Sequence, residues 1–206
     1  MEFKIEKTVV YGLDKSIIAS GNAMRTTMQD NELEAGEKDF KRAYNLGNTG
    51  TGEGHDNFLN GIIVQFDIYA PLYMWKQLQR YHFLDFISSQ STMHRLTKFN
   101  VAECCVKDTD EIILERYQDL LNEYNHWDEW YEDNEKSREL KQQAWRTLVA
   151  SLPCGFVLGA TMTTNYRQLK TIYHQRKHHK LDEWHLFCRW CEQLPNFKDL
   201  CLGKEK

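Results

Sequence analysis

The sequence lacks any long apolar run. No stretch approaches the roughly 18 consecutive apolar residues that a membrane-spanning helix needs. The amino-terminal segment, MEFKIEKTVVYG, alternates charged and apolar residues and has no apolar centre of the kind found in signal peptides. We therefore expect a soluble, cytoplasmic protein with no membrane partner.

A large excess of one charge is also missing. The chain has 26 lysine and arginine residues against 30 aspartate and glutamate residues, for a net charge of −4. Domains that bind nucleic acid in bulk are usually strongly basic. We therefore expect no nucleic-acid partner, and any anion site must be local.

Three common functional motifs are absent. Without a G-x-G-x-x-G or a Walker loop, a flavin or nucleotide would not be held by a Rossmann or P-loop device. The serines of SSQST (residues 88–92) lack a surrounding G-x-S-x-G elbow. Such serines more often form turns or contact phosphate than act as nucleophiles.

Proline is scarce, with three residues in 206, and the chain is long enough to bury a core. We expect a single domain over residues 1–206. The six cysteines are expected to be reduced, because no signal peptide directs the chain to an oxidising compartment. Residues 45–55 are rich in glycine, which is typical of a flexible loop or of backbone that approaches a ligand.

Strands and helices alternate along the predicted chain. β-branched and aromatic residues predict strands in the first dozen residues, at 61–69 and from Gly155. Residues 83–96 are polar and predict a loop that leads into a short element. Helices are expected at 71–82, 111–131 and 135–152, from Asn165, and at 182–193. This pattern predicts an α+β fold.

The segment TTNYRQLKTIYHQRKHHK (residues 163–180) predicts a helix that begins at Asn165, a good N-cap residue. Arg167, Thr171, His174 and His178 would then share one face. The helix amino terminus and its arginines suit an anionic ligand such as a phosphate. The alternative is that the basic residues near the end of the helix only complement its dipole.

Cys188 and Cys191 form a C-x-x-C motif, and together with the nearby histidines they raise the alternative of a zinc site. The spacing does not match the standard zinc modules. The two cysteines stand at i and i+3 of an amphipathic helix with Phe187 and Trp190, where cysteine behaves as a small core residue. We therefore expect no metal.

Two long blocks resemble the flavin-dependent thymidylate synthases. Gly54–Phe83 is similar to that family's G-H-x-x-x-x-E, strand, A-P-x-x-x-x-x-Q-x-x-R-H-R block, without a gap from His55 to Arg80. Leu152–Arg176 is similar to its L-P, strand, N-x-R-S-L-x-x-F-x-x-L-R block, also without a gap. The resemblance implies an α+β fold with a mixed or antiparallel sheet packed with helices.

The resemblance also implies roles for individual residues. The residues expected to contact FAD are His55, Asn57, Asn60, Arg80, His82, Asn165, Arg167 and Thr171. The residues expected to contact the nucleotide are Gln77, Ser91, Arg95 and Arg176. Of these, Arg95 and Arg176 are also the catalytic candidates, because preorganised arginines can stabilise charge on the pyrimidine carbonyl oxygens.

The chain departs from the family pattern within the signature R-H-R-x-x-S-x-N-E-x-S-x-R. Arg80 is followed by Tyr81 and His82 rather than by histidine and arginine. The signature glutamate is missing, and Ser91 falls at its position once about three extra residues are allowed. Thr171 replaces a more usual asparagine or histidine. The nucleotide pocket is therefore expected to differ from that of typical members.

The implied reaction is methylation of dUMP at C5, with methylenetetrahydrofolate as carbon donor, NADPH as electron source and FAD as cofactor. The family's sites form between the subunits of a homotetramer, and Trp127 and Trp130 would suit an interface. Three alternatives remain. They are a variant modification of a pyrimidine deoxynucleotide such as hydroxymethylation, a non-catalytic flavin- or nucleotide-binding homologue, and a structural metal-binding protein.

Overall fold

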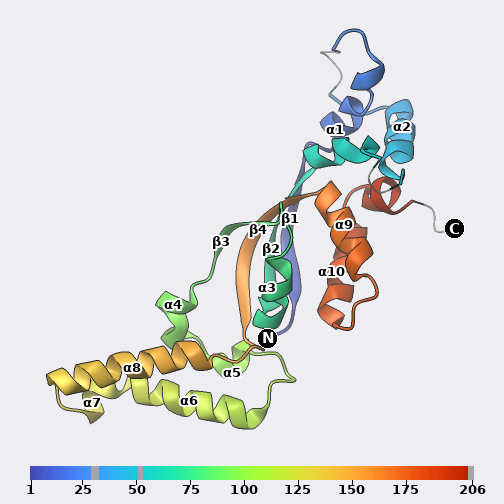
Figure 1. Cartoon of the computed structure of the whole chain (residues 1–206). Helices are drawn as coiled ribbons and strands as arrows, with labels where there is room; N and C mark the ends of the chain where they lie inside the picture. The colour runs from blue at the N-terminus through green and yellow to red at the C-terminus, as the bar shows by residue number, and fades with distance from the viewer. Residues whose placement is uncertain (29–32, 51–52, 204–206) are drawn as a thin grey trace. The chain divides into compact units, whose positions relative to one another are not determined.

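Four strands of the described residues form one sheet (Figure 1). A computed structural model describes residues 1–28, 33–50 and 53–203, so Thr51 and Gly52 of the glycine-rich loop lie outside the described residues. The strand order is β1–β2–β4–β3. The strands are β1 (Lys4–Tyr11), β2 (Ile63–Pro71), β3 (Asp85–Ser89) and β4 (Val157–Asn165).

The two central strands run antiparallel. The backbone N–H of Leu72 donates to Phe156 O at one end of the pair, and that of Tyr166 donates to Ile62 O at the other, both at 3.0 Å. Along β2 the side chains alternate between buried and partly buried positions, as a sheet with one packed face requires. The predicted α+β fold is confirmed, and of the two expected arrangements, mixed or antiparallel, the sheet has the antiparallel one.

The chain divides into two compact units. Unit 1 comprises residues 1–4, 69–77 and 88–160, and unit 2 comprises residues 5–68, 78–87 and 161–206. Both units include parts of the strands.

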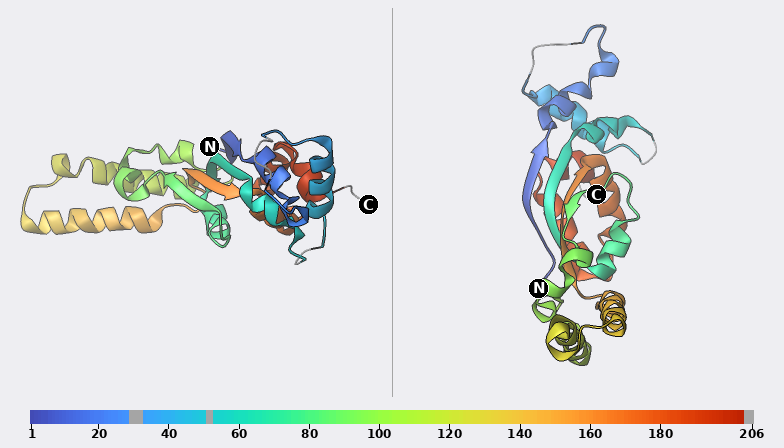
Figure 2. Two further views of the ribbon diagram at one scale, coloured as in Figure 1. Left: turned by 90° about the horizontal axis from the view of Figure 1, so that it is seen from above. Right: turned by 90° about the vertical axis from the view of Figure 1, so that its left-hand side faces the viewer.

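Unit 1 is built largely from helices. They are α3 (Leu72–Leu78), α4 (Thr92–Arg95), η3 (Leu96–Lys98), α5 (Val101–Cys104), α6 (Glu111–Asn125), α7 (Trp127–Trp130) and α8 (Glu135–Ser151). Helices α6 and α8 lie side by side (Figures 1 and 2). Their buried side chains pack with Phe156, the residue just before β4. Trp127 is buried and its Nε1 donates to Ser137 at 3.1 Å, so it packs within its own unit. Trp130 is exposed.

A buried hydrogen bond joins α6 to α8. The hydroxyl of Tyr117 donates to Leu148 O at 3.1 Å, and burial raises the pKa of Tyr117 to about 12. Replacing Tyr117 with phenylalanine is expected to lower the free energy of unfolding by about 1 kcal/mol, because Leu148 O then has no donor from this ring. Chemical denaturation measures this loss. Tyr131→Phe is the matched control, because Tyr131 is exposed where it bonds Glu123, and we expect little change.

The pH dependence supplies a second measurement on the same variant. The unfolded pKa of tyrosine is about 10, so the folded state retains the Tyr117 proton to higher pH than the unfolded chain. Its contribution to stability is therefore complete below pH 10 and is lost as the pH rises toward 12. The fall in stability over this window should be smaller in Tyr117→Phe than in the parent. If the parent and Tyr117→Phe lose the same amount of stability between pH 10 and 12, the raised pKa of Tyr117 is wrong.

Unit 2 carries α1 (Leu13–Ala19), η1 (Asn22–Met24), α2 (Glu37–Gly47), the 3₁₀ segment η2 (His55–Gly61), α9 (Tyr166–Arg176), α10 (Asp182–Gln193) and the short π-helix η4 (Lys198–Leu202). Helices α9 and α10 lie side by side (Figure 1). The ring of Trp190 on α10 packs against Phe66 of β2, with centroids 4.6 Å apart. Gly47 lets α2 approach η4, because a Cβ there would collide with the backbone oxygen of Leu200.

The C-x-x-C motif lies in this core. Cys188 and Cys191 are both buried beside Phe187, which confirms the interpretation as small core residues. All six cysteines are free thiols. In the part of the chain that the structure describes, no group of three or more potential metal ligands occurs. Within the same residues, no helix has both the length and the apolar character needed to cross a bilayer.

Three predicted elements differ from the structure. The helix expected at 111–131 is divided at His126 into α6 and α7. The helix expected at 71–82 ends at Leu78, because the next residues are mostly exposed and polar and a further turn would bury little apolar surface. Arg80 therefore lies in a turn rather than on a helix face with Gln77. The region expected to be a loop, 83–96, contains β3, an edge strand whose residues are all exposed. Such a strand has no buried alternation to signal it.

Candidate functional site

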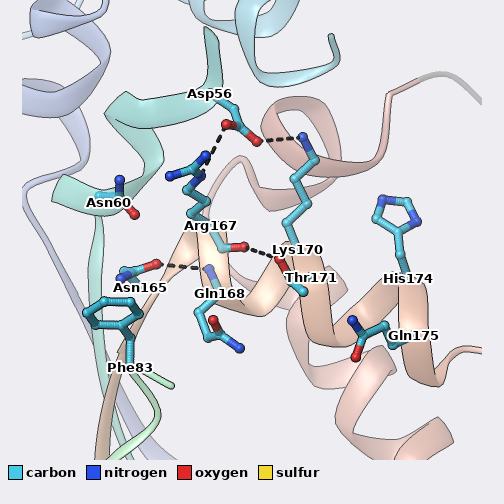
Figure 3. A pocket seen from close by; sticks show the side chains of 10 residues that line it. All are labelled: Asp56, Asn60, Phe83, Asn165, Arg167, Gln168, Lys170, Thr171, His174 and Gln175. Carbon is cyan, nitrogen blue, oxygen red and sulfur yellow. Dashed lines mark hydrogen bonds and ion pairs between the residues drawn. The ribbon is translucent and has the colours of Figure 1, made fainter. Parts of the chain in front are cut away.

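A pocket of about 430 Å³ opens in unit 2 along α9 (Figure 3). Its walls come from η2, from the turn before β3 and from α9. The lining residues are Asp56, Asn60, Phe83, Asn165, Arg167, Gln168, Lys170, Thr171, His174 and Gln175. The size is within the range of small-molecule sites.

The junction of β4 and α9 positions most of this wall. The strand ends at Asn165, whose side-chain oxygen accepts a hydrogen bond from Gln168 N at 2.9 Å. This is the predicted N-cap, and it is confirmed. The helix then presents Arg167, Thr171 and His174 to the pocket as the spacing predicted. His178 lies beyond the end of α9.

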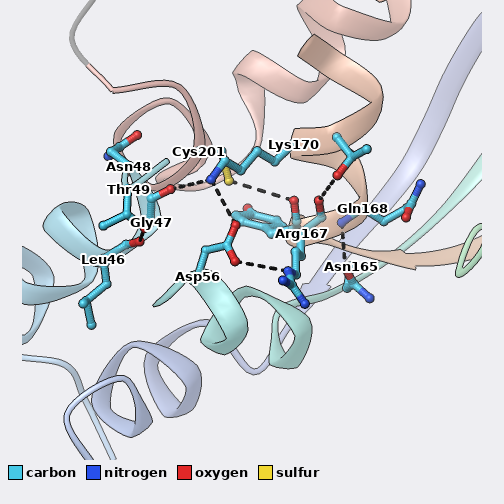
Figure 4. A network of polar contacts seen from close by, with 12 residues as sticks. Leu46, Gly47, Asn48, Thr49, Asp56, Asn165, Arg167, Gln168, Lys170 and Cys201 are labelled. Carbon is cyan, nitrogen blue, oxygen red and sulfur yellow. Dashed lines mark hydrogen bonds and ion pairs between the residues drawn. The ribbon is translucent and has the colours of Figure 1, made fainter. Parts of the chain in front are cut away.

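Asp56 anchors two cations at the pocket wall (Figure 4). One carboxylate oxygen lies 3.2 Å from Arg167 Nε, and the other lies 3.1 Å from Lys170 Nζ. Lys170 also donates to Gly47 O at 2.7 Å. The side chains of Lys170 and Asp56 are only 11% and 17% exposed, so this is a largely desolvated ion pair. Through it η2 and the end of α2 are tied to α9.

The pocket carries more positive than negative charge. Its lining includes two basic side chains, Arg167 and Lys170, and one acidic side chain, Asp56. Partial burial, followed by the nearby Lys177 and Lys170, lowers the pKa of His174, which keeps this ring neutral near pH 7. The Arg167 side chain is 39% exposed and can reach a ligand. The site therefore suits an anionic ligand with hydrogen-bonding edges.

The structure gathers only part of the predicted site at this pocket. Four of the residues expected to contact FAD line it: Asn60, Asn165, Arg167 and Thr171. Others are in unit 2 but not in the pocket lining: His55, Asn57, Arg80, His82 and Arg176. The remaining three belong to unit 1: Gln77, Ser91 and Arg95.

Ser91 and Thr171, two further predicted residues, make hydrogen bonds within or at the start of their own helices. Ser91 is the N-cap of α4, and its hydroxyl accepts a hydrogen bond from His94 N at 3.1 Å. Thr171 donates from its hydroxyl to Arg167 O at 3.1 Å, within α9. These contacts orient the side chains.

Arg176 is held by aromatic residues of unit 2. Its Nε donates to the Tyr81 hydroxyl at 2.6 Å, and that hydroxyl donates to Gln175 Oε1 at 3.1 Å. The guanidinium carbon lies 4.6 Å from the ring centroid of Trp184, a cation–π distance. Tyr81, which stands where the family has histidine, therefore fixes the orientation of Arg176.

Sequence reasoning missed half of the pocket. The residues not predicted to line it are Asp56, Phe83, Gln168, Lys170 and Gln175. Lys170 follows Arg167 by one turn of α9, so helical spacing was a signal for it. Asp56 directly follows His55 but had no motif of its own.

The fold is that of the flavin-dependent thymidylate synthases. Two solved structures of the flavin-dependent thymidylate synthase ThyX of Helicobacter pylori, complexed with FAD and dUMP, match this chain with TM-scores of 0.67 and 0.65. Each is 17% identical in sequence, and the match covers 100% of both chains.

A UMP/dUMP methylase from Streptomyces cacaoi, solved with 5-bromo-dUMP, also matches. Its TM-score is 0.58 at 14% identity, over 93% of this chain and 88% of that one. No family model matches the sequence. No curated protein matches it by sequence either.

Proposed function

We propose that this protein is an FAD-dependent enzyme that methylates dUMP at C5, with methylenetetrahydrofolate as carbon donor and NADPH as electron source. The observation that carries the proposal is the pocket beside α9. Four residues that the family resemblance assigns to flavin converge there, on a fold whose solved examples hold FAD and dUMP. We place this activity in the cytoplasm and treat residues 1–206 as one functional domain.

The side chains at the pocket fit FAD in chemical type. Arg167 and Lys170 supply the positive charge that a pyrophosphate needs. The amides of Asn60 and Gln168 can donate to and accept from the edge of a flavin ring. When bound, FAD supplies the hydride for reduction of the transferred carbon unit.

The nucleotide would be bound by residues outside this pocket. We assign the phosphate to Arg176, whose orientation Tyr81 and Trp184 fix. Arg95 is the second candidate, and it would stabilise negative charge on the pyrimidine carbonyl oxygens as C5 becomes nucleophilic. Gln77 and Ser91, which belong to unit 1 as Arg95 does, are further candidates for hydrogen bonds with a nucleotide.

We propose a homotetramer, in which a neighbouring subunit completes each site. The pocket supports this arrangement because its volume of about 430 Å³ lies at the lower end of the range for ligand sites, whereas FAD is a large ligand. Light scattering coupled to size-exclusion chromatography measures the assembly. A monomer that binds FAD at full stoichiometry would contradict it.

Reconstitution with cofactor and substrate tests the activity. The purified protein is incubated with FAD, and bound flavin is measured by its absorbance band at roughly 450 nm. The substrates dUMP, methylenetetrahydrofolate and NADPH are then added. We expect bound flavin and a nucleotide product with the mass of dTMP. Absence of bound flavin at saturating FAD would overturn the proposal.

The same experiment separates the alternatives. Bound flavin without any nucleotide product would favour a non-catalytic flavin-binding homologue. A product heavier than dTMP by one oxygen would indicate hydroxymethylation, a possibility that the missing signature glutamate raises.

A further inference from the structure

The ring of Phe83 is an exposed aromatic surface at the pocket. The residue is 67% exposed although phenylalanine is strongly apolar, and it is one of the lining residues. Figure 3 shows its ring close to the side chain of Asn165, below Asn60. The ring therefore lies among the polar side chains that can hydrogen-bond the edge of a ligand.

The backbone at Phe83 is also unfavourable for a bulky residue. Its φ is 61°, in the left-handed region that glycine and asparagine adopt readily and that a residue such as phenylalanine rarely enters. The chain is fixed on both sides of it. Leu84 is buried, and Tyr81 bonds Arg176 and Gln175 through its hydroxyl. Surroundings that hold a residue in such a conformation are often found at ligand sites.

The fold gains little from an aromatic ring at this position. An exposed ring buries little apolar surface, and a glycine would adopt the same φ without strain. The binding of a ligand with a planar ring would gain more from Phe83 than the fold does. Stacking on an aromatic side chain is favourable, and it does not depend on which hydrogen-bonding groups lie along the edge of the ring.

We propose that Phe83 is the face on which a planar heteroaromatic ring of the bound anionic ligand stacks. The amides of Asn60 and Asn165 would contact the edge of that ring, and Arg167 its charged group. The shared chemistry is a flat, nitrogen-containing ring attached to phosphate. Identification of the ring as flavin rests on the proposed function.

Isothermal titration of the full-length protein tests this proposal. The four probes are FAD, riboflavin 5′-phosphate, ADP and dUMP, which separate the isoalloxazine, adenine and uracil rings. Phe83→Leu retains apolar bulk but removes the aromatic face. We expect it to weaken binding of the stacked probe about ten-fold, equivalent to about 1.4 kcal/mol. Phe86→Leu is the matched control, an exposed phenylalanine outside the pocket lining, and should bind as the parent does.

Phe83→Gly separates a binding role from a structural one. Because glycine tolerates the positive φ, this variant should bind as weakly as Phe83→Leu while its melting temperature is no lower than that of the parent. A marked fall in melting temperature would show that the ring supports the fold and would overturn the proposal. Parental affinity for every probe in both variants would also overturn it.

The probes distinguish failure of this inference from failure of the proposed function. If the parent binds FAD and the Phe83 variants bind it equally well, the stacking proposal fails and the flavin proposal stands. If the parent binds only dUMP or ADP, and Phe83→Leu weakens that binding, stacking holds and the flavin proposal fails. If the parent binds none of the four, both fail.

Discussion

Replacing Asp56 with alanine is expected to lower the free energy of unfolding by about 3 kcal/mol, because the variant leaves a desolvated cation without its partner. The side chain of Lys170 is 11% exposed and has only Gly47 O as a further acceptor among the described residues. For a chain of this length we expect the melting temperature to fall by roughly 6–12 °C. Calorimetry measures this change.

Two further variants identify the cause. Asp56→Asn retains an acceptor oxygen for Lys170 but loses the charge, so its loss of stability should be intermediate. Asp128→Ala removes the partner of Lys141 from an ion pair in which the aspartate side chain is 83% exposed. Solvent screens such a pair, and we expect little change. If Asp56→Ala and Asp128→Ala melt alike, the anchor role of Asp56 is wrong.

The β4–α9 junction could be predicted from sequence because its signals are local. A β-branched run marks the strand, and Asn165 caps a helix whose polar face follows a spacing of three or four residues. The resulting prediction placed Arg167 and Thr171 on one face, and both line the pocket. Resemblance to a family added Asn60, which is remote in sequence from that helix.

The anchor of the pocket could not be predicted from such signals. Lys170 is 114 residues from Asp56 and 123 residues from Gly47. The spacing of residues along the sequence predicts which side chains share a face of one helix or strand. It does not predict which side chains of distant elements come into contact. The conformation of Phe83 could not be predicted from the sequence either. Its left-handed φ is imposed by the surrounding structure and is one that phenylalanine itself disfavours.

Departures from the family pattern were visible in the sequence, but their consequence was not. Tyr81 stands at a family histidine position, which predicted only that the site would differ. In the structure its hydroxyl accepts from Arg176 Nε at 2.6 Å, so the substituted residue supplies a contact to an arginine that was already a candidate. A one-dimensional pattern records that a residue has changed, whereas the partner of the new side chain is known only from the folded chain.

Replacing Arg167 with alanine should weaken FAD binding about 100-fold, equivalent to about 2.7 kcal/mol. This is within the range for a hydrogen bond to a charged group, about 1.5–3 kcal/mol. Asp56 holds Arg167 through Nε at 3.2 Å, which orients the planar guanidinium before a ligand arrives. The fold should tolerate the loss, since Asp56 retains its contact with Lys170. Isothermal titration measures the affinity, and thermal denaturation checks the fold.

Two control variants determine whether the charge of Arg167 or the geometry of its guanidinium is responsible for FAD binding. Arg167→Lys keeps the charge but loses the bidentate fork, so its affinity should lie between those of the parent and the alanine variant. Arg189→Ala removes the same charge from an exposed position on α10 outside the pocket lining, and it should bind FAD as the parent does. Equal weakening by Arg189→Ala would point to a general electrostatic effect. If Arg167→Ala binds FAD with parental affinity, the anionic group of the cofactor does not lie on α9, and the site proposed here is wrong.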